Sequence, residues 1–249
     1  MPTETAEKAE DGETLQVDVW RGTQQGSYQR FQVPRRENQS VLDVVTFIQR
    51  RLDPALAYRF ACRVGVCGSC AMTVNGRPRW TCRTHVSRVV KNGQLTIAPL
   101  RNLPIIRDLA ADLAPFFDKW KKARGRYEPG DQPRRELAVV PPESKERAAA
   151  NAAIECIGCA VCYSACDVVS LRSDYLGPAA LNRAWAAWND VRDGDRSGIL
   201  AAVSGDAGCH TCHTHQACAD HCPVGLNPTR SIAGLKRESA AAYIKGEVR

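Results

Sequence analysis

The sequence predicts an α+β protein in which a β-grasp domain is followed by an all-helical domain. Short segments typical of strands, separated by turn residues, occupy residues 15–100. Apolar residues at helical spacing dominate residues 148–243. All twelve cysteines fall into three groups of four, one in the first part and two in the second. The chain of 249 residues is long enough for two small domains.

The N-terminal domain is predicted to contain one helix and five strands. Ser40–Leu52 is the helix, because Ser40 with Asp43 three residues later suits a helix N-terminus and an apolar stripe follows. The dipeptide Asn75-Gly76 is a typical two-residue hairpin turn. The predicted strands are Leu15–Trp20, Tyr28–Val33, Ala71–Val74, Arg79–Cys82 and Gln94–Ala98.

The C-terminal domain is predicted to contain amphipathic helices at Ala179–Asp190 and Arg230–Tyr243. Trp185 and Trp188 lie on the apolar face of the first helix, which predicts that they pack in the core. Asp118–Arg147 is rich in charged residues, Gly and Pro, and is typical of a linker. The expected boundaries are a disordered tail at residues 1–14, the β-grasp domain at 15–110, a linker at 111–147 and the helical domain at 148–249.

The first group of cysteines has gaps of four, two and eleven residues and consists of Cys62, Cys67, Cys70 and Cys82. This spacing is that of 2Fe–2S ligands in plant-type ferredoxins, so the β-grasp domain is predicted to be a plant-type ferredoxin domain. Gly65 and Gly68 allow the backbone to approach a cluster closely with positive φ angles. Zinc sites usually contain two CxxC pairs, which this group does not provide.

The second group has gaps of two, two and three residues and consists of Cys156, Cys159, Cys162 and Cys166. This run is typical of bacterial ferredoxins, in which the fourth cysteine serves the other cluster. The helical domain is therefore predicted to be bacterial-ferredoxin-like. By analogy with two-cluster ferredoxins, Cys222, which precedes Pro223, is the natural fourth ligand of a 4Fe–4S cluster. That cluster would be held by Cys156, Cys159, Cys162 and Cys222.

The remaining cluster would be held by Cys166, Cys212 and Cys218. A symmetric ferredoxin has a further cysteine at the position of His215, and three thiolates without a fourth favour a 3Fe–4S cluster. A 4Fe–4S cluster with His215 as its fourth ligand is the alternative. Cys209 is left as a spare thiol. Residues 209–213 match the haem c attachment motif, but that attachment requires export and would also use Cys212.

Composition excludes several other classes. The acidic N-terminus has no apolar segment typical of a signal peptide, and no stretch approaches the roughly 18 apolar residues of a membrane span. We therefore expect a reducing cytoplasm, where clustered cysteines bind metal more often than they form disulfides. The net charge of +7 is spread along the chain, and no nucleic-acid-binding motif accompanies it.

The cysteine groups and four further segments of the chain resemble the iron–sulfur subunit of succinate dehydrogenase and fumarate reductase, the respiratory complex II family. The resemblance covers residues 15–243, nearly the whole chain. Its ligand pattern maps onto every cysteine except Cys209. The segments that carry the resemblance are Phe60–Cys70, Leu176–Ala180, Asp190–Asp193 and Cys222–Arg230.

The resemblance implies an electron-transfer subunit with 2Fe–2S, 4Fe–4S and 3Fe–4S clusters in that order. Such a subunit carries electrons between a FAD-containing flavoprotein subunit, where succinate and fumarate interconvert, and a quinone at a membrane anchor. It belongs to an oxidoreductase of electron transport and the tricarboxylic acid cycle, and has no catalytic acid or base of its own. The implied location is the cytoplasmic face of the bacterial inner membrane, as a peripheral protein.

The quinone end departs from the commonest pattern of the family. Where the family usually has a proline after the cysteine and a tryptophan five residues past it, this chain has Asp167 and Leu171. His213 and Lys236 match a histidine and a lysine that the family places near the quinone or haem edge. His215 stands where an apolar residue is common. We therefore expect His213, His215, Leu171 and Lys236 near the quinone.

Two other functions compete with this one. The same set of clusters could serve a different flavoprotein dehydrogenase or a soluble complex of the fumarate reductase type. A redox-sensing or metal-storage module without a partner enzyme is the second alternative. The flavoprotein that purifies with the chain would separate these hypotheses.

Overall fold

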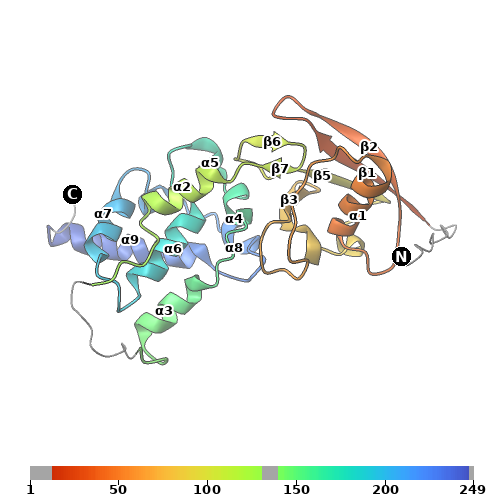
Figure 1. Cartoon of the computed structure of the whole chain (residues 1–249). Coiled ribbons are helices and arrows are strands. Elements are labelled where there is room, and N and C mark those ends of the chain that lie inside the picture. The colour runs from red at the N-terminus through yellow and green to blue at the C-terminus, as the bar shows by residue number, and fades with distance from the viewer. Residues whose placement is uncertain (1–12, 131–139, 247–249) are drawn as a thin grey trace.

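The computed structural model describes residues 13–130 and 140–246. Most of the predicted disordered tail and part of the predicted linker lie outside these residues. The described chain is elongated, with a sheet-containing half near the N-terminus and a helical half near the C-terminus (Figure 1). The predicted α+β fold class is confirmed. The limits of the domains stay a prediction.

Five strands form the main sheet in the order β2-β1-β5-β3-β4. β1 and β5 run parallel, with Val17 opposite Leu95, and the other neighbouring strands run antiparallel. The crossover between β2 and β3 carries the helix and the first three cysteines, Cys62, Cys67 and Cys70. The five strands are β1 (Thr14–Arg21), β2 (Ser27–Pro34), β3 (Ala71–Val74), β4 (Arg77–Trp80) and β5 (Gln94–Ala98).

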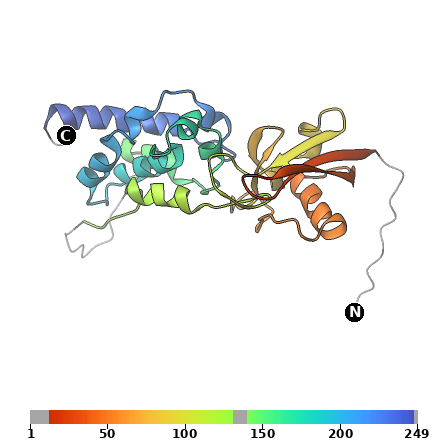
Figure 2. The same cartoon turned by 90° about the horizontal axis from the view of Figure 1, so that it is seen from above.

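Helix α1 (Val41–Phe47) covers one face of this sheet (Figure 2). Its N-terminus is a complete capping box, because the Ser40 hydroxyl accepts the Asp43 N–H and the Asp43 carboxylate accepts the Ser40 N–H. A π-helical turn, Ile48–Leu52, continues it. The buried apolar face of α1 packs with the inner face of the sheet in one core. The predicted helix and its start are confirmed.

The hairpin between β3 and β4 turns at Asn75 and Gly76, whose φ angles are +48° and +78°. Two successive positive φ angles make the tight turn that suits the twist of paired strands. The second strand runs from Arg77 to Trp80, so it begins and ends earlier than predicted. Cys82 consequently lies in the 3₁₀ turn Thr81–Arg83 after the strand.

Asp108 holds together three segments of the N-terminal half. It lies in the turn between β6 (Ile105–Arg107) and β7 (Ala110–Ala111), and its side chain is only 2% exposed. Its carboxylate accepts the N–H groups of Gly22 and Ala57 at 2.8 Å each, and the Arg21 Nε–H at 3.2 Å. The chain from Ala57 leads directly into the loop that carries Cys62, so Asp108 anchors the start of that loop.

The segment predicted as a linker contains a helix that packs in the C-terminal half. Helix α2 (Ala114–Lys122) has a proline in its first turn, and Phe116 is buried against Tyr163 and other residues of the helical core. Lys119 donates from Nζ to the carbonyl oxygens of Ser173, at 2.6 Å, and Tyr175. The charged composition of this segment makes the helix hard to predict from the sequence, because the helix makes its apolar contacts through only two aromatic side chains and a few aliphatic ones.

The helical half is built around α6, which packs against α2, α3, α7 and α9. Asn182 on α6 donates to the Ala153 carbonyl oxygen at 3.0 Å and accepts the Ser231 hydroxyl at 2.9 Å, which joins three helices through buried polar groups. Trp185 and Trp188 pack against the core, as predicted. The helices are α3 (Lys145–Ile154), α4 (Val161–Ser164), α5 (Asp167–Leu171), α6 (Pro178–Trp188), α7 (Arg196–Ser204), α8 (Ala217–Asp220) and α9 (Pro228–Ile244).

Replacing Asp108 by Ala should cost about 3 kcal/mol of unfolding free energy, because it removes a buried carboxylate that accepts the partly buried N–H groups of Gly22 and Ala57 and pairs with Arg21, which keeps only Asp53. Asp18→Ala is the matched control, since Asp18 pairs with the exposed Arg30 and should cost less than about 1 kcal/mol. Anaerobic urea denaturation followed by circular dichroism measures both. Equal costs for the two variants would contradict this role of Asp108.

Candidate iron–sulfur centres

The first group of cysteines lies in the loop that leads into β3 and in the 3₁₀ turn after β4. The Cys62 thiol accepts the N–H groups of Val66 and Cys67 at 3.3 Å each, and the Cys67 thiol accepts the Cys62 N–H at 3.4 Å. The N–H groups of Val66, Cys67 and Val64 lower the pKa of Cys62 to about 6. The loop therefore favours a thiolate at Cys62, which is the form that binds iron.

Cys70 and Cys82 complete this group from the other side. Cys70 is buried, and its carbonyl oxygen accepts the Thr81 hydroxyl at 2.8 Å, which ties the loop to the 3₁₀ turn. Burial and the adjacent Cys70 thiol raise the pKa of Cys82 to about 12, while the Gly65 N–H opposes the shift. A Cβ atom on Gly65 would lie 2.9 Å from the Trp80 ring, so only glycine fits there.

In space, Cys222 replaces Cys166 in the second group, which from here on means Cys156, Cys159, Cys162 and Cys222. This group lines an enclosed, apolar cavity in the helical half. Cys156, Cys159, Cys162 and Cys222 all border it, and Phe116, Pro223, Val224 and Leu226 form much of the remaining wall. Burial is the main cause that raises the pKa of Cys159 to about 12, and the neighbouring thiols of Cys156 and Cys222 add to the shift. The Val161 N–H opposes it. The structure thus brings Cys222 to the three cysteines that lie 60 to 66 residues earlier.

Cys166, Cys212 and Cys218 form the third group. Burial is the main cause that raises the pKa of the Cys218 thiol. The Thr229 hydroxyl, 3.2 Å away, opposes this shift, whereas the nearby thiols of Cys166 and Cys212 add to it. Tyr175 lies fully buried beside the same three thiols and forms a side-chain hydrogen bond with Cys212. Tyr175 and Thr229 are contacts that were not predicted from the sequence. Tyr175 directly precedes the Leu-Gly-Pro segment of the family resemblance, and this position is the one sequence signal that could have identified it.

Cys209 is fully buried close to the third group. Burial is the main cause that raises the pKa of Cys209 to about 11. The Lys236 ammonium opposes this shift, and the Cys212 thiol adds to it. The structure therefore places Cys209 beside the third group, where the sequence analysis expects a spare thiol.

The three groups follow one another along the molecule. The first and second meet where Gly68 packs on Cys159: a Cβ atom on Gly68 would lie 2.8 Å from the Cys159 Cβ. The second and third are close enough for the Cys218 thiol to raise the pKa of the buried Cys162, although burial contributes most of that shift. Eleven thiols thus form a series that crosses the junction between the two halves.

The residues expected near a quinone lie around the third group. Lys236 on α9 donates from Nζ to the Cys212 carbonyl oxygen at 2.7 Å. His213 and His215 are exposed, with ring centroids 6.1 Å apart. Leu171 ends the short helix that begins after Cys166, and is 84% exposed.

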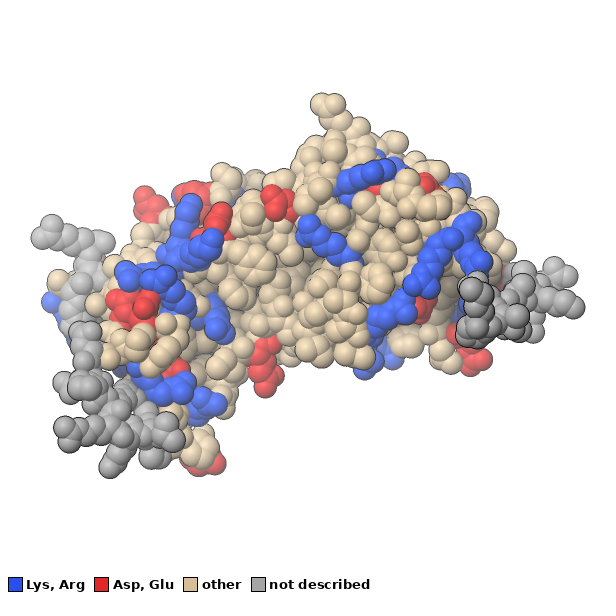
Figure 3. All heavy atoms as spheres, in the orientation of Figure 1, with Lys and Arg blue, Asp and Glu red and all other residues tan. Residues whose placement is uncertain are grey.

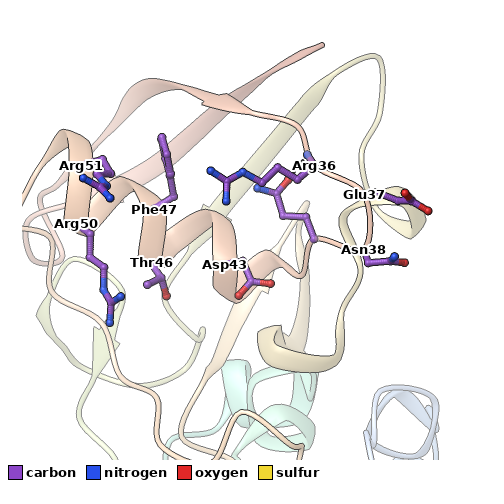
Figure 4. Close-up of a pocket in the computed structure, with 9 residues that line it drawn as sticks. Arg36, Glu37, Asn38, Asp43, Thr46, Phe47, Arg50 and Arg51 are labelled. Atoms are coloured by element: carbon purple, nitrogen blue, oxygen red, sulfur yellow. Dashed lines mark hydrogen bonds between the residues drawn. The ribbon is translucent and has the colours of Figure 1, made fainter. Parts of the chain in front are cut away.

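A polar hollow lies away from the cysteines. It is lined by Arg36, Arg50 and Arg51 around Phe47 on the outer side of α1 (Figure 4). Lys and Arg are spread over both halves of the face seen in Figure 3, with Asp and Glu between them. Among the residues that the structure describes, no three His, Cys, Asp or Glu side chains are arranged to hold a single metal ion. The described helices include none that could cross a membrane.

Two family models match the chain. The 2Fe-2S iron-sulfur cluster binding domain matches residues 15–118, and the 4Fe-4S dicluster domain matches residues 152–226. The chain therefore contains a 2Fe–2S binding domain followed by a 4Fe–4S binding domain.

Relatives with similar sequences cover most of the chain. The fumarate reductase iron-sulfur subunit of Mycobacterium tuberculosis is 35% identical over 222 residues, which cover 88% of each chain. The corresponding subunit of Haemophilus influenzae is 33% identical, over 86% of this chain and 87% of that one. The mitochondrial succinate dehydrogenase [ubiquinone] iron-sulfur subunit of Dictyostelium discoideum is 36% identical, over 79% of this chain and 70% of that one.

A solved structure is also similar to this chain over most of its length. A chain of the Mycobacterium smegmatis Sdh1 complex in the apo form superposes with a TM-score of 0.81 at 27% identity, covering 92% of this chain and 97% of that chain. The sequence resemblance to an oxidoreductase subunit is confirmed. The chain belongs to the family of fumarate reductase and succinate dehydrogenase iron–sulfur subunits.

Proposed function

We propose that the chain carries electrons between a FAD-containing flavoprotein subunit and a quinone at a membrane anchor, in a succinate dehydrogenase or fumarate reductase complex. The observation that carries this proposal is the series of three thiol groups, which touch through Gly68 and Cys159 and continue from Cys162 to Cys218. One-electron transfer along such a series needs no catalytic acid or base, so none is assigned.

The ligand sets follow the three thiol groups. Each bound cluster would supply a site that accepts and releases one electron. The donor chemistry fits, because thiolates are the usual ligands and the second group surrounds an enclosed apolar cavity. The proposed ligands are Cys62, Cys67, Cys70 and Cys82 for 2Fe–2S, Cys156, Cys159, Cys162 and Cys222 for 4Fe–4S, and Cys166, Cys212 and Cys218 for 3Fe–4S.

The flavoprotein is assigned to the sheet-containing end. Val64 and Val66, in the loop of the first thiol group, are 62% and 64% exposed, and Arg63 beside them stacks over the Phe60 ring. Exposed apolar side chains next to a cationic one are typical of a surface that a partner covers. An electron from the flavin would enter the series there, close to Cys62.

The quinone and the membrane anchor are assigned to the helical end. His213, His215, Lys236 and Leu171 surround or adjoin the third thiol group. Lys236 is held by the Cys212 carbonyl oxygen, so its positive charge lies beside the last site in the series. We place the complex at the cytoplasmic face of the bacterial inner membrane.

The assembled complex tests this function. The chain is expressed with its flavoprotein and anchor, purified anaerobically and assayed for electron transfer from succinate to a quinone analogue and for the reverse reaction with fumarate. We expect covalent or tightly bound flavin in the complex, activity in one or both directions, and no succinate oxidation by the isolated chain. A loaded complex that oxidises only another substrate would replace this function with a different flavoprotein dehydrogenase.

Gly68→Ala should slow turnover of the loaded complex, because its Cβ would overlap the Cys159 Cβ and separate the first two clusters. Gly76→Ala is the matched control: its φ is also positive, at +78°, but a Cβ there meets nothing within 4 Å. Both variants bear a backbone strain of about 1–2 kcal/mol. Turnover and the magnetic coupling between the first two clusters are measured. Equal loss in both variants would mean that strain, and not the contact, is responsible.

Cys82→Ala should remove the axial electron paramagnetic resonance signal of a reduced 2Fe–2S cluster and leave the other clusters in place. The lost ligand closes the first group, and the remaining groups lie in the other half. Cys209→Ala is the control, and should keep all three clusters. If the 2Fe–2S signal survived in Cys82→Ala, the ligand assignment would be wrong.

His215→Cys should convert the third cluster towards 4Fe–4S, because it supplies the missing thiolate. We expect the signal of the oxidised 3Fe–4S cluster to disappear and the iron content to rise from about nine to about ten atoms per chain. Thr214→Cys, one residue away, should change neither. Ten iron atoms already present in the unmodified chain would favour the alternative in which His215 is a ligand.

A further inference from the structure

A polar groove lies at the junction of the two halves, next to Cys222 of the second thiol group. The β3–β4 hairpin forms one wall with Arg77, Arg79 and Trp80, and the segment from Asp220 to Pro223 forms the other. Its cavity volume is about 200 Å³. Since a water molecule takes about 30 Å³, the groove has room for roughly six waters or a small hydrated ion.

The two arginines of this groove lack a negative partner within the described chain. Neither Arg77 nor Arg79 forms an ion pair with any residue that the structure describes. The Nε atom of Arg79 is buried and has no hydrogen-bond partner in that part of the chain. Burial, and the nearby charge of Arg77, lower the pKa of Arg79. A buried donor on a cation without an acceptor is costly, so the groove favours an anion.

His221 bridges the two walls of the groove. Its Nδ1 lies 2.8 Å from the Ala217 carbonyl oxygen, which can only accept, so Nδ1 carries the proton. Its Nε2 lies 3.4 Å from the Arg77 Nε and accepts that N–H. His221 therefore links the β3–β4 hairpin to α8. Asp220 is the one carboxylate among the lining residues, and it is exposed.

We propose that this groove binds a small oxyanion, a phosphate or carboxylate group, between the guanidinium groups of Arg77 and Arg79. A guanidinium presents paired N–H donors that match two oxygens of such a group. The anion would satisfy the buried Arg79 Nε and would bridge the hairpin to the segment that contains Cys222. Binding would therefore hold the two halves together at the junction where the first two thiol groups meet.

Binding of inorganic phosphate to the full, cluster-loaded chain tests the proposal directly. The midpoint of thermal denaturation is followed against phosphate concentration, with sodium chloride keeping the ionic strength constant. We expect a saturable rise with phosphate that chloride does not produce. The rise should disappear in Arg79→Gln and weaken in Arg77→Gln. It should persist in Arg88→Gln, whose side chain is exposed outside the groove.

A variant that is expected to strengthen phosphate binding, and not weaken it, separates an effect on binding from a loss of folding. Asp220→Asn removes the carboxylate beside the groove, and should shift saturation to a lower phosphate concentration. The proposal is overturned if phosphate gives no saturable effect beyond chloride, or if Arg79→Gln responds as the unmodified chain does. Because this readout is binding and not electron transfer, it is independent of the proposed function.

The complex with the flavoprotein distinguishes the source of the oxyanion. A small molecule remains the ligand if phosphate or acetate still binds the assembled complex with the same dependence on Arg79. If the isolated chain binds phosphate but the complex does not, a carboxylate of the partner occupies the groove, and the small-molecule source is overturned.

Discussion

The burial of cysteine thiols around three points is the constraint on which the rest of this structure depends. Burial raises the pKa of Cys82, Cys159 and Cys162, so these thiols ionise readily only when a positive charge is placed beside them. Iron would supply that charge, which links cluster binding to folding. The second group makes this link strongest. It joins the start of α4 to the loop before α9, two segments far apart in the sequence, through Cys222.

Fixed contacts between the two halves give the series of thiol groups its short spacing. Gly68 packs on Cys159, and the Arg101 N–H donates to the Ser164 hydroxyl at 2.8 Å. Asn102 donates to the Tyr163 carbonyl oxygen at 3.1 Å, again across the junction. Electron transfer benefits from such rigidity, because donor and acceptor must hold one separation through many turnovers. The oxyanion groove lies on the same junction, so its occupant would act where the spacing is set.

The helical end combines the features that the family resemblance implies with residues particular to this chain. Lys236 is bound to the Cys212 backbone, while Asp167 and the exposed Leu171 follow Cys166 on the same short helix. Tyr175 places a buried hydroxyl against Cys212. A hydrogen bond to a ligand sulfur stabilises the more negative, reduced state of a cluster. The proposed last site in the series therefore has both a donor and a cation beside it.

The sequence by itself determined the local parts of this protein. The strands, the capped helix α1 and the three cysteine groups follow from patterns within a few residues, since turns, caps and metal loops are set by near neighbours. Only the tertiary structure decided the rest. The segment predicted as a linker contains helix α2, which is stabilised by the contact of Phe116 with Tyr163, a residue far along the chain. The contacts of Gly68 with Cys159, of Tyr175 with Cys212 and of Arg77 with His221 join residues up to 144 positions apart. No local pattern encodes such pairs, because they arise only when separate elements pack together.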